Sequence, residues 1–356
     1  MTRAAMPMKK RAVIALVVLV ITAAPAWLML GVTYVVTGTA EPASFWASMP
    51  AIVGMAATAT GGRRFGVITA IVMGLLAPLT IAAGASAAAG AALMALMAIT
   101  VGRMSRFGLQ KSALLAPVML AWTLISPPTW DGQSMVDRTD NAYLLWMAII
   151  FFVGATIPAL VLPRLLRNRP RSALVPHSRA EAVPYTVIIT VLATVATYYV
   201  LDNPRLYGGA FLIAAIFVLA PIGDAQTLRP TLLRIGGTLI GSVFVLALVS
   251  QIDSLALIYL CGLVFITIAV MARFGVHGWL YYVFMMPATA SLNATALSQV
   301  GQLGEQRLID NVVGGLLVLI AAAAAAAYSH WESRRGHADD RDAEAQSITQ
   351  ALPSLT

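Results

Sequence analysis

Long apolar stretches alternate with short polar gaps along most of the chain. A helix needs about 20 apolar residues to cross the hydrocarbon core of a bilayer, with a range of about 17–25. The pattern therefore predicts an all-α fold, a polytopic bundle of membrane helices. Some stretches are shorter than a full crossing, so re-entrant hairpins are the alternative for some pairs. The predicted spans are Ala12–Val36, Phe45–Thr60, Phe65–Ile81, Ala87–Ile99, Ala113–Ser126, Ala142–Leu162, Val183–Leu201, Leu206–Pro221, Leu232–Val249, Leu255–Ala272, Trp279–Leu292 and Leu308–Tyr328.

The basic residues collect in every second gap. Cytoplasmic loops of membrane proteins carry an excess of Lys and Arg, so these gaps are predicted to lie on one side. Only Arg138, Arg205 and Arg307 fall in the other gaps. This pattern favours twelve crossings with both termini in the cytoplasm. The basic groups are Lys9-Lys10-Arg11, Arg63-Arg64, Arg103/Arg106/Lys111, the run from Arg164 to Arg179, Arg229/Arg234, Arg273 and Arg334-Arg335.

Composition agrees with a membrane protein. The chain is 59% hydrophobic with a mean hydropathy of +0.82, and only 11% of residues are charged, against about 25% in soluble domains. The net charge of +8 would also suit nucleic acid, but the basic residues flank apolar spans, so the expected partner is the lipid bilayer and no nucleic acid. The lone Cys261 excludes an intrachain disulfide. The basic start and Ala24-Pro25-Ala26 could mimic a signal peptide, but the length of the first span favours a retained helix.

Short motifs recur in the same order in the two halves. Arg106-Phe107-Gly108-Leu109 returns as Arg273-Phe274-Gly275-Val276, and Arg138-Thr139-Asp140-Asn141 is echoed by Arg307-Leu308-Ile309-Asp310-Asn311. The sequence therefore predicts two parallel six-helix repeats, related by an axis along the membrane normal. The predicted domains are 1–163 (first repeat), 164–182 (cytoplasmic linker), 183–329 (second repeat) and 330–356 (polar cytoplasmic tail, disordered). Transporters often place a substrate path at such a repeat interface; a duplicated scaffold without a path is the alternative.

The second half resembles a known family. The stretch from Asp224 to Arg229, followed by Leu233-Arg234-Ile-Gly-Gly-Thr-Leu-Ile-Gly241, is similar to the basic, glycine-rich helix entry of the fusaric-acid-resistance-like (FUSC), or aromatic acid exporter, family. Gln306-Arg307-Leu-Ile-Asp310-Asn-Val-Val-Gly314-Gly315 resembles the start of that family's last membrane helix. The resemblance covers roughly Val187–Ala327. It implies an inner-membrane permease of bacteria that exports aromatic carboxylic acids and other small toxic compounds. Many relatives carry a large soluble region between the membrane halves or after them, whereas the linker and the polar tail predicted here are short.

Ionisable side chains inside membrane spans are costly, which makes them candidates for function. Arg307 and Asp310 are three residues apart on one helical face and can pair. The functional reading makes Arg307 an anion anchor and Asp310 a proton-binding group, whereas the structural reading is a pair that fixes helix depth. Tyr282 belongs to an aromatic and Met-rich patch that could stack a ligand or simply pack. The candidate pathway residues are Arg307, Asp310, Asn311, Arg229, Arg234, Asp224, Arg138, Asp140 and Tyr282.

Several kinds of chemistry have no motif in this chain. The sequence contains no GxxxxGK[ST] loop, no HExxH and no GxSxG, so we expect no ATP hydrolysis, no metal or other cofactor, and no enzyme activity. The sequence thus predicts a secondary transporter, coupled to protons, that exports small aromatic or anionic compounds and could form a homo-oligomer. The alternatives are a membrane scaffold or assembly subunit that moves nothing, and a lipid-acting membrane enzyme.

Overall fold

A computed structural model describes most of the chain. The described residues are 7–38, 42–129, 136–165, 174–203, 209–220, 228–273, 279–293, 300–302, 304–321 and 323–324. Every regular element among them is a helix, as predicted. The helices are α1 (Met8–Thr37), η1 (Pro42–Ala47), α2 (Ser48–Ala83), α3 (Ala87–Ser105), α4 (Gln110–Ala113), α5 (Leu115–Ile125), α6 (Asn141–Leu165), α7 (Arg179–Asp202), α8 (Gly209–Leu219), α9 (Leu228–Gln251), α10 (Leu255–Arg273) and α11 (Leu280–Asn293). Residues 300–302, 304–321 and 323–324 are also helical and are called the C-terminal helix below.

The chain reverses direction inside α2. Gly62 has φ 78° and ψ −174°, a left-handed conformation that glycine adopts without strain. Residues eight apart in one straight helix would lie about 12 Å apart, yet a Cβ atom built on Gly66 would collide with the Thr58 hydroxyl. The two arms of α2 therefore fold back on each other and correspond to the predicted spans Phe45–Thr60 and Phe65–Ile81.

The number of full crossings is not confirmed. Among the described helices, six are long and apolar enough to cross a membrane, with the two arms of α2 counted together: α1, α2, α3, α6, α7 and Leu232–Gln251 of α9. The helices α5 and α8 each have 11 residues. At about 1.5 Å per residue they reach about 16 Å, roughly half of a 30 Å hydrocarbon core. The chain is thus a multi-pass membrane protein, while twelve crossings stay a prediction.

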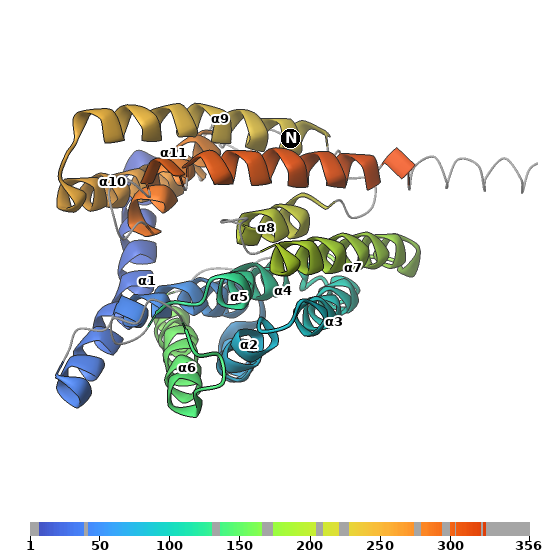
Figure 1. Cartoon of the computed structure of the whole chain (residues 1–356), viewed down its shortest axis with the longest axis horizontal. Coiled ribbons are helices and arrows are strands. Elements are labelled where there is room, and N and C mark those ends of the chain that lie inside the picture. The colour runs from blue at the N-terminus through green and yellow to red at the C-terminus, as the bar shows by residue number, and fades with distance from the viewer. Residues whose placement is uncertain are drawn as a thin grey trace, which may run out of the picture.

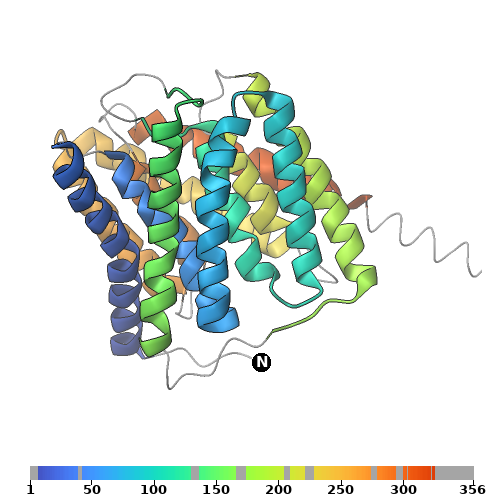
Figure 2. The same ribbon diagram turned by 90° about the horizontal axis from the view of Figure 1, so that it is seen from below.

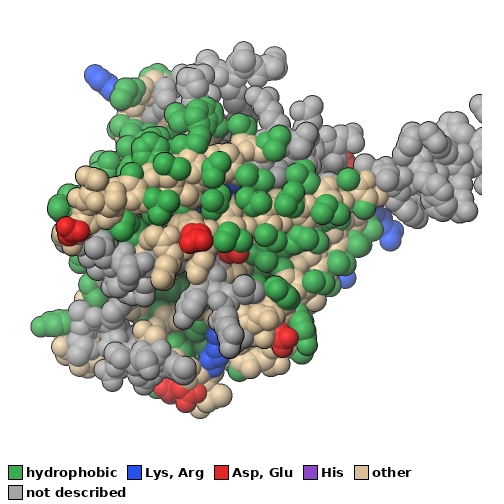
Figure 3. All heavy atoms as spheres, turned by 45° about the horizontal axis from the view of Figure 1, so that its top comes forward, with side chains coloured by type: hydrophobic (Ala, Val, Ile, Leu, Met, Phe, Trp, Pro, Cys, Tyr) green, Lys and Arg blue, Asp and Glu red, His purple; other side chains and the backbone are tan. Residues whose placement is uncertain are grey.

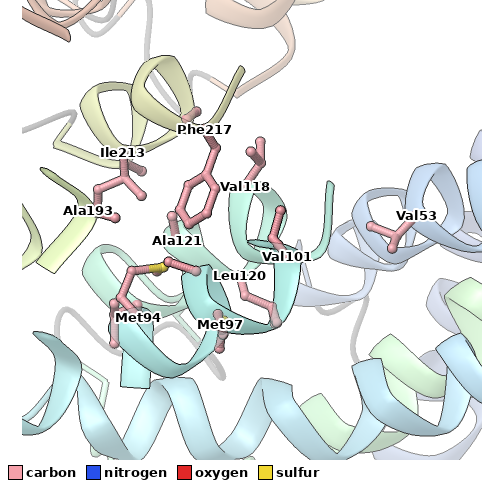
Figure 4. Packing of buried hydrophobic residues seen from close by; sticks show 14 of the residues in the cluster. Val53, Met94, Met97, Val101, Val118, Leu120, Ala121, Ala193, Ile213 and Phe217 are labelled. Atoms are coloured by element: carbon pink, nitrogen blue, oxygen red, sulfur yellow. The ribbon is translucent and has the colours of Figure 1, made fainter. Parts of the chain in front are cut away.

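The helices form a layered bundle in which α8 is central. Figure 1 shows α9 and the C-terminal helix on one side, α2, α3 and α6 on the other, and α8 between them. Only Val218 of α8 is clearly exposed, at 41%. Phe217 of α8 points toward Ala121 of α5 in the apolar core (Figure 4). A helix that is apolar all round is expected to be buried in this way.

The two predicted halves interlock. The helix α7 packs against α3, and α8 packs against α5, although α7 and α8 follow the predicted linker in sequence. In addition, α1 of the first half contacts α10 of the second half. The first and second halves are therefore not separate bundles, and their relation as two repeats stays a prediction.

The outer surface suits a lipid environment. Leucine, valine, isoleucine and phenylalanine side chains are exposed along α9, among them Leu239, Val243 and Leu246. Figure 3 shows hydrophobic side chains spread over much of the described surface on this side of the molecule. A soluble protein rarely exposes such a large contiguous apolar area, so this face is expected to contact lipid.

Candidate functional site

Two arginines meet at one asparagine in the second half. The Nε atom of Arg234, in α9, donates a hydrogen bond to Oδ1 of Asn311 at 2.7 Å. Nδ2 of Asn311 donates to the backbone carbonyl of Arg307 at 2.7 Å. Asn311 is only 1% exposed, so its amide fixes both the Arg234 side chain and its own orientation. The structure thus brings together three of the predicted site residues.

Arg307 lies over an aromatic ring at the junction of the two halves. Its guanidinium carbon is 4.6 Å from the centre of the Phe211 ring, in α8. Phe211 in turn meets Trp122 of α5 edge to face, with ring centres 4.9 Å apart. The negative face of an aromatic ring attracts a cation, which orients Arg307 toward α8. A continuous chain of contacts therefore links α5 of the first half to Arg307 and Asn311.

Arg307 and Asp310 do not form the predicted ion pair. Nη1 of Arg307 and Oδ2 of Asp310 are both buried, and neither has a hydrogen-bond partner. In the part of the chain that the structure describes, the ion pair found joins His177 to Glu181, at 3.6 Å. The prediction of a pair was wrong because Arg307 is turned onto Phe211. Buried charged groups without partners are costly, so the unpartnered Nη1 atom of Arg307 is a donor that a ligand could satisfy.

Tyr282 lies in a tightly packed contact between α9 and α11. A Cβ atom on Gly237 would be 2.6 Å from the Cβ of Tyr282, and one on Gly241 would be 2.5 Å from the carbonyl oxygen of Val283. Gly237 and Gly241 therefore allow the close helix approach that their spacing predicts. Tyr281 and Tyr282 meet edge to face with ring centres 5.4 Å apart. This geometry supports the packing role for the aromatic patch.

Arg138 joins the ends of two helices. Its Nη1 atom donates to the carbonyls of Ile81 at 3.0 Å and Leu124 at 2.8 Å, and its Nη2 atom donates to Ile125 at 3.2 Å. These carbonyls lie at the C-terminal ends of α2 and α5, where carbonyl groups lack helical partners. Burial lowers the pKa of Arg138 from its ordinary value, but arginine remains charged in proteins. Arg138 therefore acts as a shared C-terminal cap.

Asp140 caps the helix that follows. Its Oδ1 atom accepts a hydrogen bond from the backbone N–H of Ala142 at 2.9 Å, and its side chain is exposed. This is the usual role of aspartate at a helix start. Asp224 lies outside the described residues. The side chain of Arg229 is also outside them, although its backbone lies in the first turn of α9. Of the predicted residues, Arg234, Arg307 and Asn311 make one cluster, and Asp310 lies one helical turn along from Arg307.

We expect Arg138→Met to lower stability and to leave ligand binding intact. The change removes a charged donor from three buried carbonyls, and an unsatisfied buried acceptor costs about 1–3 kcal/mol. The measurement is the apparent melting temperature of the purified protein in detergent, with Arg164→Met, an exposed arginine, as the control. Equal melting temperatures for the two variants would contradict the capping role.

Sequence reasoning missed Phe211 and Trp122. Both lie in predicted spans, but neither carries charge nor belongs to a recognised motif. The available signal was weak: each is a large aromatic residue in a short, otherwise mainly aliphatic stretch. Their contact depends on α5 and α8 packing across the halves, which no local pattern specifies.

Fold and site together define a multi-pass helical membrane protein with half-buried arginines near the junction of its halves. Residues 189–321 match the model of the family described as fusaric acid resistance protein-like. The match confirms the resemblance over this segment, which includes Phe211, Arg234, Arg307 and Asn311. It suggests a role related to membrane transport or efflux. No curated protein and no solved structure matches the chain.

Proposed function

We propose that the protein is a secondary transporter of the bacterial inner membrane that exports small aromatic carboxylates. The observation that carries the proposal is the arginine cluster: Asn311 holds the Arg234 side chain and is bonded to the backbone carbonyl of Arg307, whose own Nη1 atom is buried without a partner. Guanidinium groups bind carboxylates through paired N–H donors. The family match over residues 189–321 supports a role in transport.

The surroundings of the cluster suit a ligand with an aromatic ring. Phe211 lies under the Arg307 guanidinium and contacts Trp122, so aromatic faces and edges lie next to the cation. A planar aromatic acid could place its carboxylate at Arg307 and its ring against this pair, since aromatic rings favour edge-to-face and offset contacts. The site lies close to where the two halves meet, which is where transporters with repeats often bind substrate.

The direct test is transport in proteoliposomes. The purified protein is reconstituted, loaded with labelled benzoate, and exposed to an imposed pH gradient; we expect benzoate to move faster than in protein-free vesicles. A correctly folded protein that moves no aromatic acid under any gradient would favour the alternative, a membrane scaffold that transports nothing.

Within this proposal Asp310 is the proton-binding group. Its Oδ2 atom is buried without a partner, and a carboxyl group inside a membrane bundle is a recurrent element of proton relays. We expect Asp310→Asn to fold normally and to transport benzoate at a rate that no longer responds to the pH gradient. Asp140→Asn is the matched control: it preserves the cap at the start of α6, since Asn caps as well as Asp, and should keep the response. A normal pH response in Asp310→Asn would remove Asp310 from the mechanism.

A further inference from the structure

One end of the first seven helices carries the exposed basic side chains. In Figure 2 the start of α1, the end of α6, the end of α3 and the start of α7 lie along the same lower edge of the bundle. At the opposite end the described acidic residues are Asp137, Asp140 and Asp202, and the arginine there, Arg138, is bonded to carbonyls. Glu181, the described acid of the basic end, pairs with His177. The exposed basic residues are Lys9, Lys10, Arg63, Arg64, Arg103, Arg106, Arg164 and Arg179.

The end of α3 is a defined helix stop. Leu109 N–H donates to the Met104 carbonyl at 3.1 Å and Gly108 N–H to the Ser105 carbonyl at 3.0 Å, with Gly108 left-handed at φ 72°. This is the Schellman arrangement, in which glycine ends a helix without steric cost. The Arg106-Phe107-Gly108 motif is therefore a structural turn that holds Phe107 outward, 64% exposed. Its repeat, Phe274-Gly275, lies outside the described residues.

The linker before α7 is docked on this turn. The N–H of His177 donates to the carbonyl of Ser105 at 3.2 Å. A Cβ atom on Gly108 would lie 2.7 Å from the backbone nitrogen of Val175, so the linker crosses directly over the glycine. Leu174 and Val175 are exposed there, at 47% and 59%. We call the group Arg103, Arg106, Phe107, Leu174, Val175 and Arg179 the α3–α7 tip.

The tip combines basic and exposed apolar side chains, both of which favour contact with an anionic membrane surface. Its arginines lie at the ends of membrane-spanning helices, where basic side chains are attracted to an anionic lipid surface. Its apolar side chains Phe107, Leu174 and Val175 lie outside the spans and are exposed, a combination typical of segments that insert at the boundary of headgroups and acyl chains. Topology alone would require the arginines but not the apolar side chains held beside them.

We infer that the α3–α7 tip binds the headgroups of anionic phospholipids in the leaflet on the basic side of the molecule. The arginines bind the phosphate groups, and Phe107 with Leu174 and Val175 contacts the upper acyl chains. The proposal is independent of the transported substrate, because none of these residues contacts the Arg234–Asn311–Arg307 cluster in the interactions described above.

The test compares two variants that lose equal charge. One carries Arg103→Gln, Arg106→Gln and Arg179→Gln in the tip; the control carries Lys9→Gln, Lys10→Gln and Arg164→Gln at the same end of the bundle. Each protein is purified from vesicles that contain equal amounts of phosphatidylglycerol and phosphatidylcholine, and the retained lipid is measured by native mass spectrometry. We expect the unmodified protein and the control to retain phosphatidylglycerol preferentially. In the tip variant we expect the ratio of retained phosphatidylglycerol to phosphatidylcholine to fall by about tenfold.

Two outcomes would overturn the inference. Equal loss in both variants would mean that only the total charge matters, and no preference in the unmodified protein would mean that no anionic lipid is held. Phe107→Ser provides a second arm that keeps the charge: we expect weaker retention of phosphatidylglycerol, because the apolar contact is lost. Melting temperatures within the error of the unmodified protein show that each variant is folded.

Discussion

Arg307→Gln is expected to abolish measurable binding of aromatic carboxylates. The guanidinium of Arg307 has a buried Nη1 atom without a partner, and glutamine has neither the charge nor the forked donors that bind a carboxylate. Removing one member of a buried, hydrogen-bonded charge pair costs about 2–5 kcal/mol, which corresponds to a loss of affinity by about 1.5 to 3.5 orders of magnitude.

The measurement is calorimetric titration of the purified protein with benzoate at pH 7.5, where benzoate is ionised. Arg234→Gln should weaken binding less, since the Nε atom of Arg234 is already bonded to Asn311. The exposed Arg164 provides the control, and Arg164→Gln should bind like the unmodified protein. Benzoate binding to Arg307→Gln with unmodified affinity would exclude Arg307 as the anion anchor and with it the proposed substrate site.

Hydropathy was sufficient to place the long helices. The predicted spans Ala87–Ile99, Ala142–Leu162 and Val183–Leu201 lie within α3, α6 and α7. Each of these helices buries one side and exposes the other to an apolar environment. The length of the apolar stretch in the sequence therefore indicates directly where the helix lies. Hydropathy could not show how far each short helix extends across the bilayer, because α5 and α8 are as apolar as any span but only 11 residues long.

The site shows where a sequence pattern stops being informative. Arg138 and Arg307 occupy similar positions in similar motifs, and both were predicted to line a pathway. Arg138 finds three backbone carbonyls from α2 and α5, whereas Arg307 finds an aromatic ring and retains an unpartnered nitrogen. The difference arises from helix ends and side chains that are distant in sequence. The residues next to each arginine in the sequence do not indicate which distant groups it will contact. The sequence therefore identified both arginines as candidates but could not distinguish their roles.

Gly54 determines how closely α2 approaches α6. A Cβ atom on Gly54 would collide with the backbone carbonyl of Ala155 and lie 2.9 Å from the Ala155 Cα atom. Backbone atoms inside a helix cannot rotate away as a side chain can. The two helices would have to separate, and this would disturb a core to which α6 contributes the fully buried Met147, Ile150 and Phe151.

Gly54→Ala is therefore expected to destabilise the protein by about 1–3 kcal/mol, the usual cost of overpacking a core. Gly31→Ala is the matched control, because Gly31 lies in α1 with nothing within 4 Å of its Cβ position. In a helix, alanine is favoured over glycine by about 1 kcal/mol, so Gly31→Ala should be neutral or stabilising. The same chemical change is thus expected to lower the apparent melting temperature at Gly54 and to leave it unchanged or raise it at Gly31. Parallel shifts would show that α2 and α6 do not pack as closely as Gly54 permits.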